Sequence, residues 1–456
     1  MPQAQAAPLP AADQSVLVRR LEKPASAKTA ANEAAIPLIV GIGASAGGLE
    51  AISGLLEHLP GDTNMAFVIV QHLAPGHESM MTDLLSRRTR MRVLQVREGM
   101  RIEPNSVYVI PPGCELGVSH GLLRLSGRSE EQRPPLPVDH FLSALAEDQG
   151  ERAIGVVLSG TGSDGTLGLT AIKAEGGITI AQEPMTAQHD GMPRSAIAAG
   201  CVDFVRSPDA IARELTQIAT HPYLRRKPTE SALADTALTR IFAVLRRATG
   251  HDFSGYKRAT IVRRINRRMV VHGLAGIDDY VRLLERTPRE SDELFHDMLI
   301  NVTDFFRDPE VFEAVKAFML PRLMEHRDPG EPVRIWVPGC STGEEAYSLA
   351  MILIEYLGRE WTTKAIQIFA SDIDGKAIEK ARLGLYPESI QAHVSEERLR
   401  RFFMAKPGGF QINKSIRDLC VFSTQNVAQD PPFSRIDLVS CRNLLIYLDA
   451  PLQRKV

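Results

Sequence analysis

Continuous apolar runs alternate with amphipathic stretches along the first half of the chain. Residues 37–44 are almost wholly apolar, and segment 47–59 after them repeats its apolar positions at helical spacing. Two further apolar runs, 65–70 and 153–158, end in polar or glycine-rich turns. Buried strands separated by helices predict an α/β fold with a doubly wound parallel sheet.

The pattern changes around residues 221–231, where two prolines and a basic run interrupt the periodicity and only helical patterns follow. An apolar strand at 333–337, a glycine-containing turn and an apolar helix then indicate a second α/β unit. The expected organisation is a disordered leader at 1–35, an α/β domain at 36–220, a linker at 221–234, a small all-α domain at 235–325 and a Rossmann-like domain at 326–456.

The turn after the first strand contains the first candidate chemistry. Residues 43–47 read G-A-S-A-G, a G-x-S-x-G pattern that would expose Ser45 as a nucleophile before a helix. Residues 41–46 also satisfy the dinucleotide pattern G-x-G-x-x-A. A dinucleotide site needs an acidic residue after the second strand, but that strand is followed by Gln71 and His72. His72 suits a general base, so the nucleophile interpretation is favoured and a nicotinamide oxidoreductase is a distant alternative.

A third polar loop follows the strand at 153–158 and contains Asp164. Because the carboxyl ends of parallel strands share one rim, Ser45, His72 and Asp164 are expected to converge there as a triad. The order Ser, His, Asp differs from that of α/β-hydrolases, which argues against that fold.

Residues 36–206 resemble the catalytic domain of a CheB-type protein-glutamate methylesterase. The matching motifs are G-A-S-A-G-G, Q-H-L, G-T-G-S-D-G and G-M-P-R-S-A. The resemblance implies Ser45 as nucleophile, His72 as base and Asp164 as its orienting acid, with backbone near Ala46 and Thr161 as oxyanion donors. It also implies hydrolysis of glutamate methyl esters, with glutamine deamidation as a second reaction. Alanine stands at Ala46, where the family usually has threonine. The family's receiver domain is absent from this sequence, so control by aspartyl phosphorylation within this chain is not expected.

A basic amphipathic helix is expected at 256–269. Its apolar face holds Ile261, Val262, Ile265 and Met269. The basic residues of the other face are Lys257, Arg263, Arg264, Arg267 and Arg268. A solvated surface is the simplest interpretation; a docking site for an acidic helix is the sharper one, preferred to nucleic acid because no aromatic residues are interleaved.

The turn after the strand at 333–337 reads P-G-C-S-T-G-E-E, which lacks the lysine of a phosphate-binding loop. Two acidic residues would repel a pyrophosphate, whereas Asp372, after the next strand, can bind ribose hydroxyls. A nucleoside without phosphates fits both features, and S-adenosylmethionine is the common one. For Asp372 a helix N-cap is the competing role, although Asp374 or Gly375 could take that cap.

Residues from about 235 resemble a CheR-type protein-glutamate methyltransferase. The matches are the basic helix, N-V-T-D-F-F-R, G-C-S-T-G-E-E-A-Y-S, A-S-D-I-D and C-R-N-L-L-I-Y-L-D. The resemblance implies that Arg307 and Tyr447 lie near the transferred methyl group and that the basic helix docks on a receptor. The cofactor contacts it implies are Asn301, Thr303, Arg307, Glu344 or Glu345, Asp372, Asn426, Val427, Asn443 and Leu444.

Net charge, cysteine content and hydropathy limit the possible partners and cellular compartment of the protein. A net charge of −2 argues against wholesale nucleic-acid binding. The five cysteines have neither disulfide nor zinc spacing, and no run is apolar enough for a membrane span. We therefore expect a cytoplasmic protein without a metal. The CheB and CheR resemblances imply that its partner is a methyl-accepting chemoreceptor or a similar signalling protein, through which it would associate with a membrane.

The last predicted strand, 436–440, is only the fourth of about seven expected in such a methyltransferase sheet. The methyltransferase half is thus expected to be incomplete, with an uncovered strand edge. Two hypotheses follow: a bifunctional enzyme that adds and removes methyl groups on receptor glutamates, or a signalling scaffold whose methyltransferase half binds S-adenosylmethionine or a partner without turnover.

Overall fold

The computed structural model describes residues 36–71, 80–127, 136–225, 233–325, 331–358 and 366–456. The predicted leader and residues 226–232 of the predicted linker lie outside these residues.

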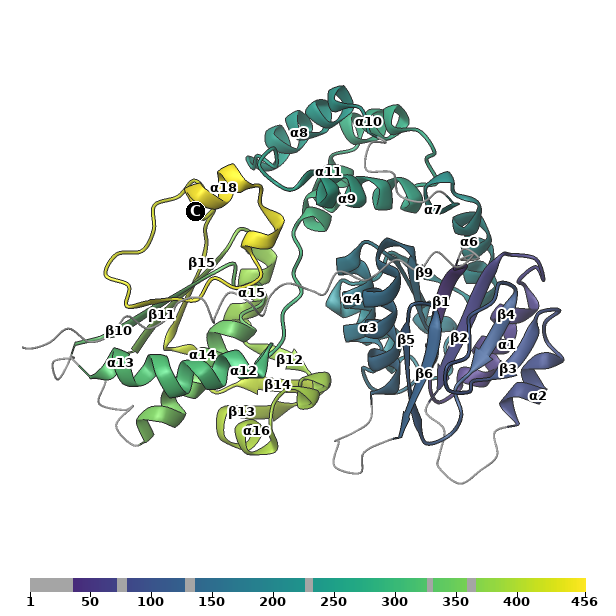
Figure 1. Cartoon of the computed structure of the whole chain (residues 1–456), viewed down its shortest axis with the longest axis horizontal. Helices are drawn as coiled ribbons and strands as arrows, with labels where there is room; N and C mark the ends of the chain where they lie inside the picture. The colour runs from purple at the N-terminus through teal and green to yellow at the C-terminus, as the bar shows by residue number, and fades with distance from the viewer. Residues whose placement is uncertain (1–35, 72–79, 128–135, 226–232, 326–330, 359–365) are drawn as a thin grey trace, which may run out of the picture. The chain divides into compact units, whose positions relative to one another are not determined.

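Seven parallel strands form the sheet of the first domain, in the order β3-β4-β2-β1-β7-β8-β9 (Figure 1). Their bounds are β1 Leu38–Ala44, β2 Met65–Gln71, β3 Arg92–Gln95, β4 Ser106–Val109, β7 Ala153–Val157, β8 Ile178–Gln182 and β9 Phe204–Arg206. A hairpin, β5 Cys114–Ser119 and β6 Leu122–Gly127, lies outside the sheet. The three strands predicted from apolar runs are β1, β2 and β7, so the parallel α/β prediction is confirmed.

Helices cover both faces of this sheet. Their bounds are α1 Gly48–Glu57, α2 Met81–Ser86, α3 Pro137–Gln149, α4 Thr166–Glu175, α5 Gly191–Ala199, α6 Pro208–Thr220 and α7 Pro222–Arg225. On one face, Val40 and Ile42 of β1 join the core that includes α1 and α6. On the other, a Cβ at Gly43 would lie 2.1 Å from Cγ1 of Val138, so α3 packs directly onto the strand backbone.

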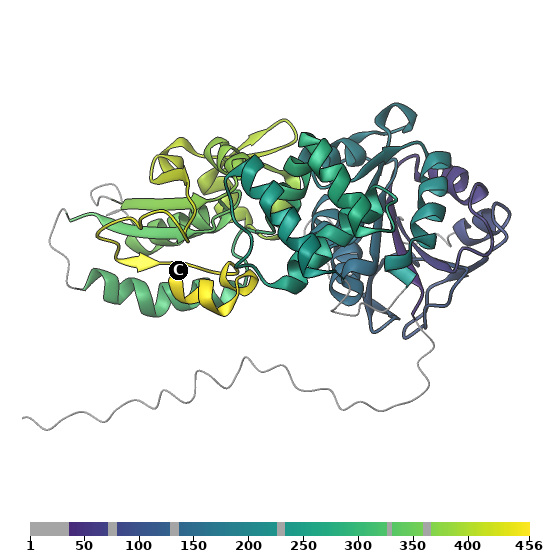
Figure 2. The ribbon, with the colours of Figure 1, turned by 90° about the horizontal axis from the view of Figure 1, so that it is seen from above.

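Four helices make the all-α part: α8 Asp235–Thr249, α9 Arg258–Val271, α10 Ile277–Arg286 and α11 Pro288–Met298 (Figure 2). The apolar face predicted for the basic helix is confirmed, because Ile261, Ile265 and Met269 of α9 are buried in the core of this bundle.

The last domain is built on four parallel strands in the order β15-β11-β10-β16. These are β10 Val333–Pro338, β11 Ile366–Asp372, β15 Cys420–Thr424 and β16 Leu438–Val439, so the predicted strand at 436–440 is shorter than expected. Helices α14 Glu344–Leu357 and α15 Gly375–Leu383 follow β10 and β11, respectively. The other helical segments of this part are α12 Pro309–Ala314, a π-helical turn Val315–Met319, α13 Leu320–Met324 and α18 Ala450–Lys455.

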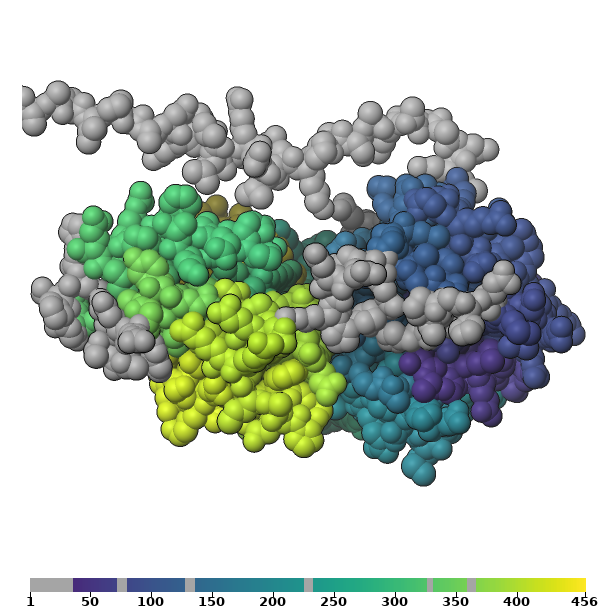
Figure 3. Space-filling view, turned by 90° about the horizontal axis from the view of Figure 1, so that it is seen from below, coloured from purple at the N-terminus to yellow at the C-terminus, as the bar shows by residue number. Residues whose placement is uncertain are grey.

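An antiparallel sheet, β12-β14-β13, is inserted between β11 and β15. Its strands are β12 Leu385–Pro387, β13 Phe403–Lys406 and β14 Gly409–Ile412, with α16 Glu396–Phe402 and α17 Lys414–Arg417 around them. This yellow-green segment lies at the surface in the space-filling view (Figure 3). Among the described residues of the whole chain, no helix is long and apolar enough to span a membrane.

Candidate active sites

Three loops of the first domain leave the same rim of its sheet. Ala44, the last residue of β1, pairs with Gln71 of β2, and Gly43 pairs with Val157 of β7. Ser45 therefore follows a strand end that lies between Gln71 and Val157, the strand residue that precedes the loop of Asp164. His72 lies outside the described residues, so its role as the base stays a prediction.

Hydrogen bonds from two neighbouring strands fix the backbone of Ser45. Its N–H donates to the carbonyl oxygen of Ser159 (3.0 Å), and its carbonyl oxygen accepts from Nε2 of Gln71 (3.1 Å) and from the N–H of Gly48 (2.9 Å). Gly47 has φ of 71°, and a Cβ there would lie 2.7 Å from Oγ of Ser159. The glycine of this turn is thus required both by its left-handed backbone and by close packing.

The two predicted oxyanion donors are placed so that they could receive a ligand atom. Ala46 and Thr161 are exposed, and within the described residues their N–H groups bind no acceptor. Ser159 holds the loop of Ala46, because its hydroxyl donates to the carbonyl oxygen of Ala46 (2.9 Å) and accepts from the N–H of His189 (3.0 Å). Ser159 was not predicted as a site residue; its only signal in the sequence is its place as a polar residue directly after a buried strand.

Asp164 is buried and held by the start of a helix. Its Oδ1 accepts from the N–H of Asp139 (2.8 Å) and its Oδ2 from the N–H of Val138 (3.1 Å). Asp139 was also missed, since an acidic residue in the first turn of an amphipathic helix is ordinary in sequence.

The second candidate site is a pocket between the end of the helical bundle and the carboxyl ends of β10 and β11. Eight of the predicted cofactor or methyl-transfer residues line it: Asn301, Thr303, Arg307, Glu345, Asp372, Asn443, Leu444 and Tyr447. Three others, Glu344, Asn426 and Val427, are not among its lining residues. Tyr256, which the sequence analysis did not single out as a site residue, lines the pocket as well.

Asp372 is oriented by the backbone around it. Its Oδ2 accepts from the N–H of Ser341 (2.7 Å) and its Oδ1 from the N–H of Asp374 (2.9 Å). Burial raises the pKa of Asp372. Helix α15 is capped by Asp374, whose side chain accepts from the N–H groups of Lys376 and Ala377, so the competing role of helix cap for Asp372 is excluded.

The adjacent glutamates of the G-E-E turn face different surroundings. Glu345 lines the pocket and accepts from the hydroxyl of Ser440 (2.5 Å), and burial raises its pKa. Glu344 bonds the hydroxyl of Thr342 (2.7 Å), and burial raises its pKa to about 8. The sequence could not distinguish the two, and the structure places only Glu345 at the pocket.

Two of the predicted cofactor residues already have partners inside the protein. Nδ2 of Asn301 donates to Oδ2 of Asp374 (2.6 Å). Arg307 donates from Nη1 to the carbonyl oxygen of Val302 (2.8 Å) and still lines the pocket. Asn426 instead bonds its own turn through the N–H of Ala428 (3.0 Å).

The prediction that the basic residues of α9 form an exposed surface is wrong for three of the five residues. Arg264, Arg267 and Arg268 are buried, whereas Lys257 is exposed and Arg263 is half-buried. Arg268 pairs with Glu290 of α11 (2.5 Å), Arg267 pairs with Asp297, and Arg264 donates to the carbonyl oxygen of Lys173 (2.6 Å). Composition indicated a charged face but not the buried acids that neutralise it.

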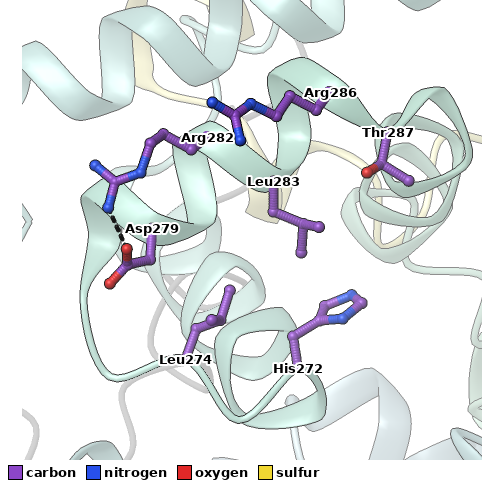
Figure 4. A pocket seen from close by; sticks show the side chains of 7 residues that line it. All are labelled: His272, Leu274, Asp279, Arg282, Leu283, Arg286 and Thr287. Atoms are coloured by element: carbon purple, nitrogen blue, oxygen red, sulfur yellow. Dashed lines mark hydrogen bonds and ion pairs between the residues drawn. The ribbon is translucent and has the colours of Figure 1, made fainter.

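The helical bundle has a further hollow, between the end of α9 and α10 (Figure 4). Leu274 and Leu283 supply its apolar lining, and Arg282 pairs with Asp279 at its rim. His272, also in its lining, bonds Oε2 of Glu290 (2.7 Å), so this imidazole belongs to the buried ion-pair network of the bundle.

The chain matches three family models in succession. Residues 40–215 match CheB methylesterase, residues 236–299 match the all-alpha domain of CheR methyltransferase, and residues 301–456 match its SAM binding domain. The chain is 32% identical to chemotaxis protein methyltransferase 1 of Pseudomonas aeruginosa over 50% of this chain and 84% of that protein.

Two other relatives extend the comparison to the first domain. An uncharacterized 104.1 kDa protein of Rhodobacter capsulatus is 37% identical over 82% of this chain, and the match covers 42% of its own length. The crystal structure of the Thermotoga maritima CheB methylesterase catalytic domain shares 31% identity over 40% of this chain and 98% of that chain, with a TM-score of 0.38. The chain thus spans less than half of the Rhodobacter relative.

Proposed function

We propose that this chain removes and adds methyl groups on glutamates of a chemoreceptor-like protein. The chain belongs to the CheB and CheR families, because a CheB methylesterase domain is followed by the two domains of a CheR methyltransferase. The main support is the register of β1, β2 and β7, in which the strand ends before Ser45, at Gln71 and at Val157 lie on one rim of the sheet.

In the hydrolytic reaction Ser45 is the nucleophile. Its Oγ attacks the ester carbonyl carbon while His72 takes its proton, and Asp164 orients the imidazole. The N–H groups of Ala46 and Thr161 receive the oxyanion, near the N-terminus of α1. Methanol leaves with the proton from His72, and water then attacks the acyl group on Ser45 to regenerate the serine and release the glutamate carboxylate.

The lining of the second pocket fits S-adenosylmethionine, which would supply an activated methyl group. The hydroxyl oxygen of Ser341 is buried there without a hydrogen-bond partner among the described residues, so the pocket holds a polar atom that a ligand could satisfy. We assign the ribose hydroxyls to Asp372 and the substrate carboxylate to Arg307, whose guanidinium can bind it in a bidentate manner. Tyr447 would border the same end of the pocket. A carboxylate is already an anion, so positioning is the chief task of these residues.

We propose receptor docking only for the accessible basic residues of this helix, Lys257 and Arg263. A chemoreceptor-like partner would also imply that the protein acts in the cytoplasm.

The esterase proposal is tested by release of methanol from methylated chemoreceptor membranes. Ser45→Ala should lower kcat by roughly three or more orders of magnitude. Ser86→Ala, at an exposed serine of α2 in the same domain, is the matched control and should hydrolyse normally. Wild-type protein without any release would favour a scaffold, and equal release by the Ser45 variant would place the nucleophile elsewhere.

The methyltransferase proposal is tested by calorimetric titration with S-adenosylmethionine. Asp372→Ala should weaken binding by about 10- to 100-fold, the value of a lost charge-assisted hydrogen bond. Asp418→Ala removes an exposed carboxylate of the same domain and should leave binding unchanged. Unchanged binding by the Asp372 variant would refute the assignment of the ribose.

A further inference from the structure

The first turns of α3 and α4 exchange side-chain caps beside the nucleophile loop. Asp164, in the loop before α4, accepts from the N–H groups of Val138 and Asp139 at the start of α3. Asp139 in turn accepts with Oδ1 from the N–H of Gly168 in the first turn of α4 (2.8 Å). Each carboxylate therefore satisfies helix N–H groups that have no partner within their own helix.

Close packing makes this exchange sensitive to small shifts. A Cβ at Gly168 would lie 2.4 Å from Cβ of Leu142 and 3.2 Å from the carbonyl oxygen of Asp139. Gly165, which precedes α4, has φ of 92°. The two helix starts are thus in direct contact, and any displacement of Asp139 moves the donors that hold Asp164.

The pair is poorly suited to two negative charges. Asp139 is buried, and within the described residues its Oδ2 has no hydrogen-bond partner. Burial, followed by the nearby charge of Asp164, raises the pKa of Asp139 well above its usual range; the N–H groups of Gly165, Leu167 and Gly168 oppose this only in part. Asp164, by contrast, receives N–H donors on both oxygens.

We propose that Asp139 is a positioning residue of the esterase site, which carries the proton of the Asp139 and Asp164 pair and fixes the Asp164 carboxylate by joining α3 to α4. This inference rests on the proposed esterase function. Its consequence is that the neutral form of Asp139 is the active form, because a second negative charge would repel the carboxylate of Asp164 and displace it.

The test compares three full-length variants in methanol release, with kcat and KM measured from about pH 6 to about pH 9. Asp139→Asn keeps an oxygen for the N–H of Gly168 and has no charge. Asp139→Ala removes the cap. Glu147→Gln replaces an exposed carboxylate of the same helix and is the control for carboxylate loss.

We expect Asp139→Asn to keep kcat within about threefold of wild type and to lose the alkaline fall of the wild-type profile. Asp139→Ala should lower kcat by about 10- to 100-fold with KM nearly unchanged, the size of a misplaced catalytic group. Wild-type kcat in Asp139→Ala would overturn the proposal, and so would an Asn variant as impaired as the Ala variant.

A second measurement separates this inference from the proposed function. A raised pKa means that the folded state holds the proton of Asp139 more tightly than the unfolded state, so the stability it contributes is present at low pH and is lost as pH rises through the folded pKa. Asp139→Asn should remove this loss, measured as the pH dependence of unfolding. If wild type releases no methanol, the proposed function fails, and an unchanged pH dependence in Asp139→Asn would still refute the shared proton.

Discussion

Glu344→Gln should make the last domain less sensitive to alkaline pH. Glu344 is buried in the first turn of α14, with its carboxylate bonded to the hydroxyl of Thr342, and burial raises its pKa to about 8 from an ordinary 4.5. At neutral pH the side chain therefore carries a proton. Glutamine has the same shape as this neutral acid, so the substitution should cost little below pH 7.

The magnitude follows from proton linkage. The folded state holds the proton more tightly than the unfolded state, so between the two pKa values the stability contributed by Glu344 falls as pH rises, by ~1.4 kcal/mol per pH unit. From about pH 6 to about pH 8 the wild type should lose at most about 2 to 3 kcal/mol relative to Glu344→Gln. For a domain of this size this corresponds to roughly 5 to 10 °C in Tm.

Tryptophan fluorescence can report this domain alone, because both tryptophans of the chain, Trp336 and Trp361, fall within residues 301–456. Trp336 lies in β10, where its Nε1 donates to Oγ of Ser371 (3.0 Å). Thermal unfolding would be followed in the full chain at several pH values. Glu379→Gln, at an exposed position of α15, controls for the loss of a carboxylate and should keep the wild-type slope.

A parallel loss of stability in Glu344→Gln and wild type as pH rises would refute the neutral form of Glu344. That result would mean that the carboxyl of Glu344 is ionised in the folded state and is solvated or paired there. A large loss of stability in Glu344→Gln relative to wild type at low pH would also contradict a neutral Glu344 in the folded protein.

Gly343→Ala should destabilise the same domain by about 2 to 4 kcal/mol, because φ at Gly343 is 97° and an added Cβ would lie 3.0 Å from Cβ of Ala381. Gly408 has φ of 78° and open space around an added Cβ, so Gly408→Ala should cost only about 1 kcal/mol in the same unfolding assay. Glu290→Gln should cost about 2 to 4 kcal/mol in urea unfolding followed by far-UV circular dichroism, because it removes the nearer carboxylate beside the buried guanidinium of Arg268 and leaves Asp297, at 3.8 Å, as its charge partner. A loss below about 1 kcal/mol would contradict this. The thiol of Cys201, whose pKa is raised to about 11 by burial, should resist alkylation at neutral pH until the protein unfolds; rapid labelling of the folded protein, located by mass spectrometry, would contradict this.

Elements with strong periodicity could be predicted from sequence, and so could motif residues at strand ends. The runs that became β1, β2 and β7 are continuously apolar, and parallel strands fix which loops meet. Ser45 and Asp164 could therefore be assigned to one rim before any coordinates. The same logic assigned Asp372 to the pocket, whereas it left the helix cap open between Asp374 and Gly375 until the structure identified Asp374.

Contacts between helices could not be predicted in this way. Asp139 and Glu344 look like ordinary acidic residues of a first helical turn, and only packing shows that both are buried. The arginines of α9 look like a solvated face until Glu290 and Asp297, distant in sequence, are seen to neutralise them. Long-range pairing of this kind leaves no periodic trace in a single sequence.

The exchanged caps of Asp139 and Asp164 also affect how genetic experiments on this protein should be designed. Ser45 is tied to its surroundings through backbone atoms, so removing its hydroxyl leaves those bonds in place. Asp164 joins two helices through its side chain, and removing it leaves the start of α3 uncapped. A cell with a substitution at Asp164 would therefore contain less of the protein and would lose its activity. A cell with a substitution at Ser45 would contain a normal amount of inactive protein. Comparing the two phenotypes would separate what the protein does by catalysis from what it does by being present.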